Sequence, residues 1–276
     1  MKRHWLAVVA LLLTASAWGA TFVLVKNVIV RIAPEPFIFW RFTTAGVILI
    51  AIALARGRIT RAMLIPGMIL GTLVFTGYVM QTRGLLTISP SRSAFLTGLY
   101  VVIVPFFDRD PTHKHVYKWI AAILALIGTT LLIGDIQSTA IALGDWLTLG
   151  CAVIFALHVV YSSRWSKRDT ASGLAAVQVL FVGLLAAPFA LFAKPTHWDA
   201  SIIGAILFTA IVTTALAFAA LMWGQARVSA TEAAVTLAFE PVAAAIVSIA
   251  FYGEPLTATF AAGALLILSA MVMSQL

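Results

Sequence analysis

The sequence predicts an all-α integral membrane protein with ten transmembrane helices, arranged as two inverted five-helix repeats around a central cavity. Three observations lead to this fold class. Hydrophobic residues make up 62% of the 276-residue chain and charged residues 10%, and the mean hydropathy is +1.04. Ten apolar segments follow one another with short polar connections, and the second half repeats features of the first. A chain this apolar is excluded from the class of water-soluble domains.

Each apolar segment is long enough to cross a bilayer core, which takes about 20 helical residues. The first segment resembles a secretory signal, because Lys2 and Arg3 precede an apolar run that reaches Ala15-Ser16-Ala17. The run continues through Trp18 to Val25, so we interpret it as the first span. The expected spans are 5–25, 34–55, 62–82, 89–107, 116–134, 143–163, 171–192, 200–222, 229–252 and 256–275.

The distribution of basic residues predicts the orientation in the membrane. The net charge is +8, but the basic residues are dispersed over short connections, which argues against nucleic-acid binding. With the amino terminus inside, 12 of the 18 Lys and Arg residues fall on one side and 4 on the other, while Arg41 and Arg92 lie within spans. Both termini are therefore expected to be cytoplasmic in a multi-pass protein of the bacterial inner membrane.

An internal repeat divides the chain. At an offset of 140, residues 89–105 align with residues 229–245, and at an offset of 137, Trp18-Gly19-Ala20-Thr21 aligns with Phe155-Ala156-Leu157-His158. The shared order of these matches indicates that five spans occur twice. Because five is odd, the second repeat enters the membrane inverted, as in many secondary transporters. The expected repeats are residues 1–137 and 138–276.

Several short motifs carry a family resemblance that covers essentially the whole chain. They are Trp18-Gly19, Gly144-Asp145, Ala-Phe-Glu-Pro-Val at 238–242 and Gly-Glu-Pro-Leu at 253–256. Together they resemble the EamA branch of the drug/metabolite transporter superfamily, and residues 91–105 look like the YddG-type exporters of aromatic amino acids and related metabolites. The resemblance implies a ten-helix basket with helices 5 and 10 outside the cavity. One departure is Asp-Arg-Asp-Pro at 108–111, where such halves often carry a Gly-Glu pair.

Polar and aromatic side chains on helical faces predict the cavity lining. Trp18 and Thr21 share one face of the first span, and His158 lies on the matching face of the sixth. An indole and an imidazole do not serve the close helix packing that small residues allow, so we expect them to line a cavity. The third and fourth spans add tyrosines, which suit planar apolar solutes, although Tyr78 fits a residue of the interfacial aromatic belt equally well. The expected substrate-binding residues are Trp18, Thr21, Tyr78, Gln81, Thr97, Tyr100, His158, Gln178 and Glu240.

Glu240 is the one acid expected deep in the membrane. It lies 11 residues beyond Ser229, roughly 16 Å along a helix and close to the bilayer midplane. An ionisable group at this depth needs a proton or a partner, and it usually has a function. We consider three roles. Glu240 patches a backbone carbonyl left free by Pro241, such as that of Leu237, or it exchanges a proton during transport, or it binds the amino group of a solute.

Two other charged features have alternative interpretations. Arg41 either reaches the outer interface or attracts the carboxylate of a solute, and we favour the interface. Asp108, Asp110, His113 and His115 have residue types that bind metals, but Arg109, Lys114 and Lys118 interrupt them. We therefore expect a solvated loop, with no metal and no cofactor.

These observations favour a non-enzymatic secondary carrier that exports a small metabolite, with amino acids as the first expectation from the resemblance. The expected partners are the solute and the lipid bilayer, with proton coupling as a further expectation and the oligomer open between monomer and homodimer. A polytopic membrane enzyme acting on a small or lipid-like substrate is one alternative, although no set of catalytic side chains converges on one depth. A channel is another, although no ring of like residues is evident.

Overall fold

The computed structural model describes residues 2–108, 115–133, 141–193, 197–252 and 257–273. All regular secondary structure in these ranges is helical. The α-helices are α1 (Lys2–Ile29), α2 (Pro34–Ala55), α3 (Leu64–Gly84), α4 (Pro90–Gly98), α5 (Tyr100–Phe107), α6 (His115–Ile133), α7 (Leu143–Trp165), α8 (Ala171–Leu191), α9 (Ala200–Ala210), α10 (Ala217–Gln225), α11 (Ala230–Leu237), α12 (Glu240–Tyr252) and α13 (Ala258–Met273). A 3₁₀ turn, η1 (Arg61–Met63), precedes α3, and a π-helical segment, η2 (Ile211–Leu216), joins α9 to α10.

Six helical stretches in the described ranges are long and apolar enough to cross a membrane. They are Arg3–Ile29, Pro34–Ala55, Arg61–Gly84, Leu143–Trp165, Ala171–Leu191 and Ala200–Gln225. Shorter apolar helices occupy Arg92–Phe107, Trp119–Leu131 and Ala261–Met273. The predicted all-helical, multi-pass membrane fold is therefore correct at this level.

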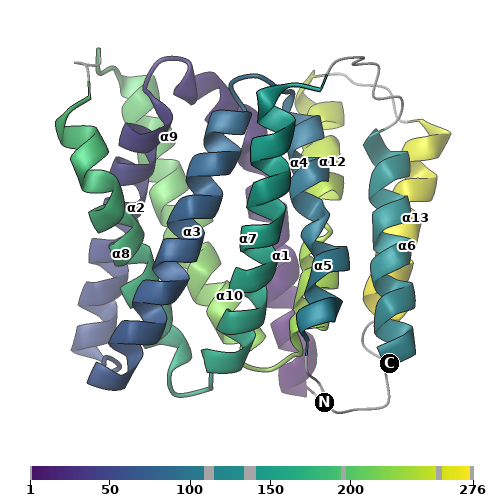
Figure 1. The fold of residues 1–276 in the computed structure, drawn as a ribbon, viewed down its shortest axis with the longest axis horizontal. Helices are drawn as coiled ribbons and strands as arrows, with labels where there is room; N and C mark the ends of the chain where they lie inside the picture. Colours follow the sequence, from purple (N-terminus) through teal and green to yellow (C-terminus); the bar gives the residue numbers. More distant parts are fainter. Residues whose placement is uncertain (1, 109–114, 134–140, 194–196, 253–256, 274–276) are drawn as a thin grey trace.

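The helices pack side by side with their axes aligned, and they form one bundle (Figure 1). α1 begins and α13 ends at the same end of the bundle, which is the lower end in Figure 1 and is called the lower end below. α6 and α13 lie together at one edge of the bundle (Figure 1). Gly128 of α6 allows this close pairing, because an added Cβ would lie 2.7 Å from the carbonyl oxygen of Gly263.

Two segments predicted as continuous spans contain breaks, and a third contains a π-helical segment. Residues 89–107 divide at Leu99 into α4 and α5, and residues 229–252 divide at Ala238 and Phe239 into α11 and α12. At both breaks a backbone N–H bonds to the carbonyl three residues earlier, from Leu99 to Leu96 and from Phe239 to Thr236. Such bonds tighten the turn and end the regular helix. Within residues 200–222, η2 widens the helix instead of ending it.

Pro241 lies in the first turn of a helix and not inside a continuous one, because α12 begins at Glu240. The N–H groups of a first turn have no partner within the helix, and the missing proline donor therefore costs little there. The break itself comes earlier, at Ala238 and Phe239.

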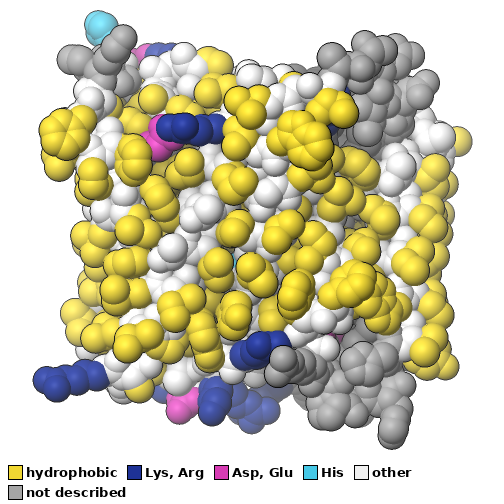
Figure 2. Space-filling view, viewed as in Figure 1, with side chains coloured by type: hydrophobic (Ala, Val, Ile, Leu, Met, Phe, Trp, Pro, Cys, Tyr) yellow, Lys and Arg dark blue, Asp and Glu magenta, His cyan; other side chains and the backbone are white. Residues whose placement is uncertain are grey.

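Charged side chains concentrate at the ends of the bundle. Figure 2 shows a wide hydrophobic band across the face in view, with most of its Lys and Arg side chains along the lower edge. Helix order puts Arg56, Arg58 and Arg61 at this end between α2 and α3, and Lys167 and Arg168 between α7 and α8. The apolar band matches the hydrocarbon core of a bilayer, since charged groups avoid that region.

Candidate functional site

A cavity with about 760 Å³ of empty space, open solvent at its mouth included, is lined by residues of α1, α2, α3, α4, α5, α7, α10, α11 and α12. Its lining on α1 runs from Trp18 to Val25 and on α3 from Val74 to Leu85, so it extends from mid-height towards the upper end. Eight of the nine residues expected from the sequence line it: Trp18, Thr21, Tyr78, Gln81, Thr97, Tyr100, His158 and Glu240.

Gln178, the ninth expected residue, lies one layer behind the cavity wall. Its side chain is fully buried, and its Oε1 lies 2.8 Å from Nε2 of His158. α8, which carries Gln178, packs on α2 and α3 rather than entering the lining. Gln178 therefore orients the imidazole of His158, which itself faces the cavity.

Seven of the nineteen lining residues carry rings, and several of these rings contact one another or the ring of Phe42 behind them. The ring of Tyr78 lies 4.9 Å from that of Phe42 and 5.7 Å from that of Phe155, centre to centre. The ring of Phe218 adds further contacts, at 5.7 Å from Trp18 and 6.3 Å from His158. Tilted and edge-to-face contacts of this kind hold each ring in place. The wall offers flat apolar faces from both halves of the sequence.

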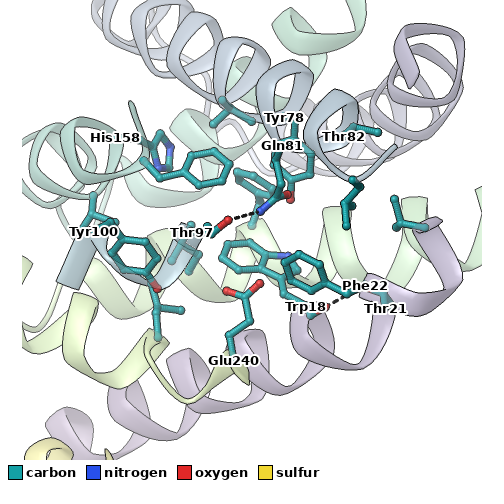
Figure 3. Close-up of a pocket in the computed structure, with 18 of the residues that line it drawn as sticks. Trp18, Thr21, Phe22, Tyr78, Gln81, Thr82, Thr97, Tyr100, His158 and Glu240 are labelled. Carbon is teal, nitrogen blue, oxygen red and sulfur yellow. Dashed lines mark hydrogen bonds between the residues drawn. The ribbon is translucent and has the colours of Figure 1, made fainter. Parts of the chain in front are cut away.

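Hydrogen bonds fix several polar groups of the lining. The indole Nε1 of Trp18 donates to the carbonyl of Thr213 at 2.8 Å, and Nε2 of Gln81 donates to Oγ1 of Thr97 at 3.0 Å (Figure 3). The hydroxyl of Thr21 donates back to the carbonyl of Trp18 on its own helix, at 2.9 Å. Thr21 therefore offers a solute an acceptor rather than a donor.

Glu240 points from the start of α12 into the cavity, next to Trp18 (Figure 3). Its side chain is 8% exposed and makes no hydrogen bond or ion pair with any residue of the described ranges. The backbone-patch role at the carbonyl of Leu237 stays a prediction. Gly19 lets α1 pass close to this point, because a Cβ there would meet the carbonyl oxygen of Glu240 and, at 2.9 Å, the backbone nitrogen of Ala244.

Arg41 does not reach the membrane interface, so the favoured interpretation from the sequence is wrong. It lines the cavity and is 4% exposed. Its Nε donates to Oγ1 of Thr214 at 2.6 Å, and its Nη2 donates to Oγ1 and the carbonyl of Thr213 at 3.1 and 3.2 Å. These acceptors lie in η2, which faces α2 in the bundle interior.

Sequence reasoning also left out Phe22, Thr82 and Phe218, which line the cavity. Phe22 directly follows Thr21, and Thr82 directly follows Gln81. The cavity is therefore lined by more than one face of α1 and of α3. For Arg41 a signal was present in the sequence, because an arginine within an apolar span usually faces the interior of a membrane protein.

The charged loop after α5 lies partly outside the described residues, which exclude Asp110 and His113. Asp108, the described acid of this group, accepts hydrogen bonds from the backbone N–H and the hydroxyl of Thr231, at 3.0 and 2.6 Å. Asp108 therefore caps the start of α11 and joins the two halves of the chain at the lower end.

Further hydrogen bonds join helices across the lower end of the bundle. Arg164 of α7 donates to the carbonyl of Phe107 at 2.7 Å, and Ser162 donates to Oε1 of Gln225 at 2.6 Å. Ser166 donates to the carbonyl of Met222 at 2.7 Å. These bonds join helices at the lower end, which also carries a second, more open pocket beside Asp108, Arg164 and Ser229, whereas the main cavity extends towards the upper end.

Comparisons with known proteins agree with this architecture. The chain is 31% identical to an uncharacterized transporter of Archaeoglobus fulgidus, over 100% of this chain and 87% of the relative. It is 26% identical to the uncharacterized inner membrane transporter YicL of Salmonella typhimurium, over 96% and 93% of the two chains. A crystal structure that is 20% identical in sequence has the same fold, with a TM-score of 0.80 over 99% of this chain and 97% of the other. The model of the EamA-like transporter family matches residues 5–134 and again residues 142–275, so this chain belongs to the EamA-like transporter family.

Proposed function

We propose that this transporter exports small metabolites, most of all aromatic and other apolar amino acids, by alternating access through the central cavity. The observation that carries the proposal is the cavity itself: an aromatic-walled site at mid-height with a buried cation, Arg41, and a buried acid, Glu240. Apolar rings suit the side chain of such a solute, and the two charged groups suit a carboxylate and an amino group. The YddG-type resemblance of residues 91–105 agrees with this solute class.

Alternating access is supported by the position of the cavity relative to the two ends of the bundle. The main cavity extends towards the upper end, and interhelical contacts occur at both ends: Asp108 with Thr231 at the lower end and Arg92 with Asp145 at the upper end. On the positive-inside rule we assign the lower end, with both termini, to the cytoplasm, and a cavity that extends towards the upper end then fits an outward-facing state. Export requires that the lower contacts open while the upper end closes.

Ten crossings in two inverted repeats are the architecture that we propose for this mechanism. Helix occurs over each of the ten expected spans, and α1 begins where α13 ends. α4 and α11 begin 140 residues apart, as do α5 and α12. The inverted relation supports two alternative states, because each repeat can adopt the shape of the other.

The proposal is tested by counterflow in proteoliposomes with a panel of radiolabelled amino acids and metabolites. Exchange of unlabelled for labelled aromatic amino acid should saturate with concentration, and the recovered solute should be chemically unchanged. Unsaturable flux would favour a channel, and a modified solute would favour a membrane enzyme. No exchange above that of empty liposomes for any amino acid in the panel would refute amino-acid transport.

A pair of variants connects the transport to the cavity. Trp18→Ala removes a ring from the cavity wall, whereas Trp5→Ala removes an indole from the exposed start of the same helix. Loss of ring contacts predicts about a tenfold weaker apparent affinity for aromatic amino acids in Trp18→Ala. Trp5→Ala should retain wild-type affinity, and an equal loss in both variants would indicate a general effect on α1.

A further inference from the structure

Arg41 is a buried cation without an acidic partner. Three salt bridges occur within the described residues, Arg31 with Asp199, Arg83 with Glu35 and Arg92 with Asp145, and none includes Arg41. The guanidinium keeps its charge at any physiological pH, so it cannot avoid the cost of burial by losing a proton. A buried charge of this kind is stable only when hydrogen bonds or an opposite charge compensate it.

The hydrogen bonds of Arg41 account for only one edge of the guanidinium. Nε and Nη2 donate to Thr213 and Thr214 of η2, and Nη2 also lies 3.5 Å from the hydroxyl of Tyr78. The hydroxyl of Thr213 already donates to the carbonyl of Thr209, at 3.1 Å, so it presents a lone pair to Arg41. Nη1 donates to no described residue, and the side chain lines the cavity. Two N–H groups therefore remain for a ligand.

The aromatic rings beside Arg41 restrict where that ligand can bind. The guanidinium carbon lies 5.1 Å from the ring centre of Tyr78 and 5.4 Å from that of Phe42. These cation–π contacts and the bonds to η2 hold the guanidinium in one position. The two free N–H groups belong to Nη1 of a charged guanidinium held in a fixed plane, and such donors match an anionic acceptor such as a carboxylate better than a neutral one.

The geometry points to Arg41 as the group that binds the carboxylate of the transported solute, so that the carrier selects carboxylates over otherwise identical amides. The inference rests on the proposed function, because it assigns a specificity-determining residue to the same cavity. Trp18 and Phe155 line that cavity and give the apolar body of the solute its contacts. Glu240 lines it as well and offers a site for an amino group.

The test compares L-phenylalanine with L-phenylalaninamide, which keeps the ring and the amino group but lacks the carboxylate. Competition against counterflow of labelled phenylalanine should give wild-type protein an affinity for the acid about 10- to 100-fold higher than for the amide, as expected for charge-assisted hydrogen bonds to a carboxylate. In Arg41→Gln this ratio should fall to about 1, because the acid binds more weakly while binding of the amide changes little. Arg41→Lys keeps the charge without the fork and should give an intermediate ratio.

Arg83→Gln is the matched control, because Arg83 is an arginine paired with Glu35 outside the cavity lining. It should keep the wild-type ratio. If Arg41→Gln does not fold, stabilisation of the wild-type protein against heat provides the same comparison, with phenylalanine raising the melting temperature and the amide having a much smaller effect.

The outcomes distinguish this inference from the proposed function. Counterflow of amino acids together with equal affinities of the wild-type protein for acid and amide would overturn the carboxylate site and leave amino-acid transport intact. An unchanged ratio in folded Arg41→Gln would do the same. Absence of counterflow for every amino acid would refute the proposed function, and the inference would fall with it.

Discussion

The break between α4 and α5 and the break between α11 and α12 lie at the same place in the two halves of the chain but carry different chemistry. The second helix of each pair begins with a residue that lines the cavity, Tyr100 in the first half and Glu240 in the second. Their positions differ by the repeat offset of 140 residues. Both halves therefore share the break in the helix, but the residue that follows the break is a tyrosine in the first half and a glutamate in the second. The acid is thus confined to one wall of the cavity.

A second pair of equivalent positions differs in packing. Gly19 of α1 lies against the start of α12, where a Cβ would meet the backbone of Glu240 and Ala244. Its counterpart at an offset of 137, Ala156 of α7, is fully buried with its methyl group in place. The two helix crossings are therefore not interchangeable, and the closer one lies beside the acid. Variants at matched positions can test whether the asymmetry matters for transport.

The largest effect is expected from Glu240→Gln compared with Tyr100→Phe. Glutamine keeps the size of the side chain but cannot carry a proton, so a coupling role predicts that exchange persists while pH-driven accumulation disappears. Tyr100→Phe removes one hydroxyl and should leave accumulation within about twofold of wild type, because a neutral hydroxyl contributes little net binding energy. Accumulation is measured in proteoliposomes across an imposed pH gradient.

Two other results would assign a different role to Glu240. Weaker solute affinity with accumulation retained would mean that the carboxylate binds the amino group of the solute. Wild-type accumulation and affinity in Glu240→Gln, at all pH values, would end both roles and remove the distinction between the two breaks. Equal loss of accumulation in Tyr100→Phe would make the cavity functionally symmetric at this level.

A smaller effect, on stability, is expected from Gly19→Ala compared with Ala156→Gly. The added methyl of Gly19→Ala overlaps backbone atoms of α12, which cannot rotate away, so overpacking should destabilise the protein by about 1–3 kcal/mol. Ala156→Gly should cost roughly 0.5–1 kcal/mol, the usual difference between these residues within a helix. Melting temperatures of the purified proteins in detergent give the order. A larger drop for Ala156→Gly would contradict the difference in crossing distance.

The cavity lining was predictable to the extent that it follows helical periodicity within one span. Trp18 and Tyr78 were identified in this way, because a bulky or polar side chain on an apolar helix has few alternatives to facing the interior. The position of Gln178 was not predictable, because it depends on how deeply α8 packs behind its neighbours. The hydrogen-bond partners of Arg41 were not predictable for a related reason, because its acceptors, Thr213 and Thr214, lie about 170 residues away in the sequence.

The fold was predictable in its helical segments but not in their irregularities. Apolar length alone indicates where a span lies, since the bilayer sets the length. The breaks at Leu99 and Phe239 and the π-helical segment depend on contacts with other helices, which no local pattern contains. Pro241 was an ambiguous signal, because proline is tolerated in a first turn as well as at a bend.

The smallest effect is expected at the helix caps that precede the two breaks. Ser229 accepts a hydrogen bond from the N–H of Glu232, whose carboxylate accepts one from the N–H of Ser229. Ser89 accepts from the N–H of Arg92 in the same way, but the side chain of Arg92 bonds to Asp145 and does not complete a reciprocal cap. Ser89 is also the more exposed of the two serines, so water can replace its hydroxyl.

Ser229→Ala should therefore destabilise the protein by about 1 kcal/mol and Ser89→Ala by about 0.5 kcal/mol, within the usual range for helix caps. Threonine keeps the capping hydroxyl, so Ser229→Thr and Ser89→Thr are the matched controls and should melt close to wild type. The comparison needs melting curves of all four variants under one detergent condition. A greater loss for Ser89→Ala would mean that the first break depends more on its cap than the second, and that the carboxylate of Glu232 maintains α11 without the hydroxyl of Ser229.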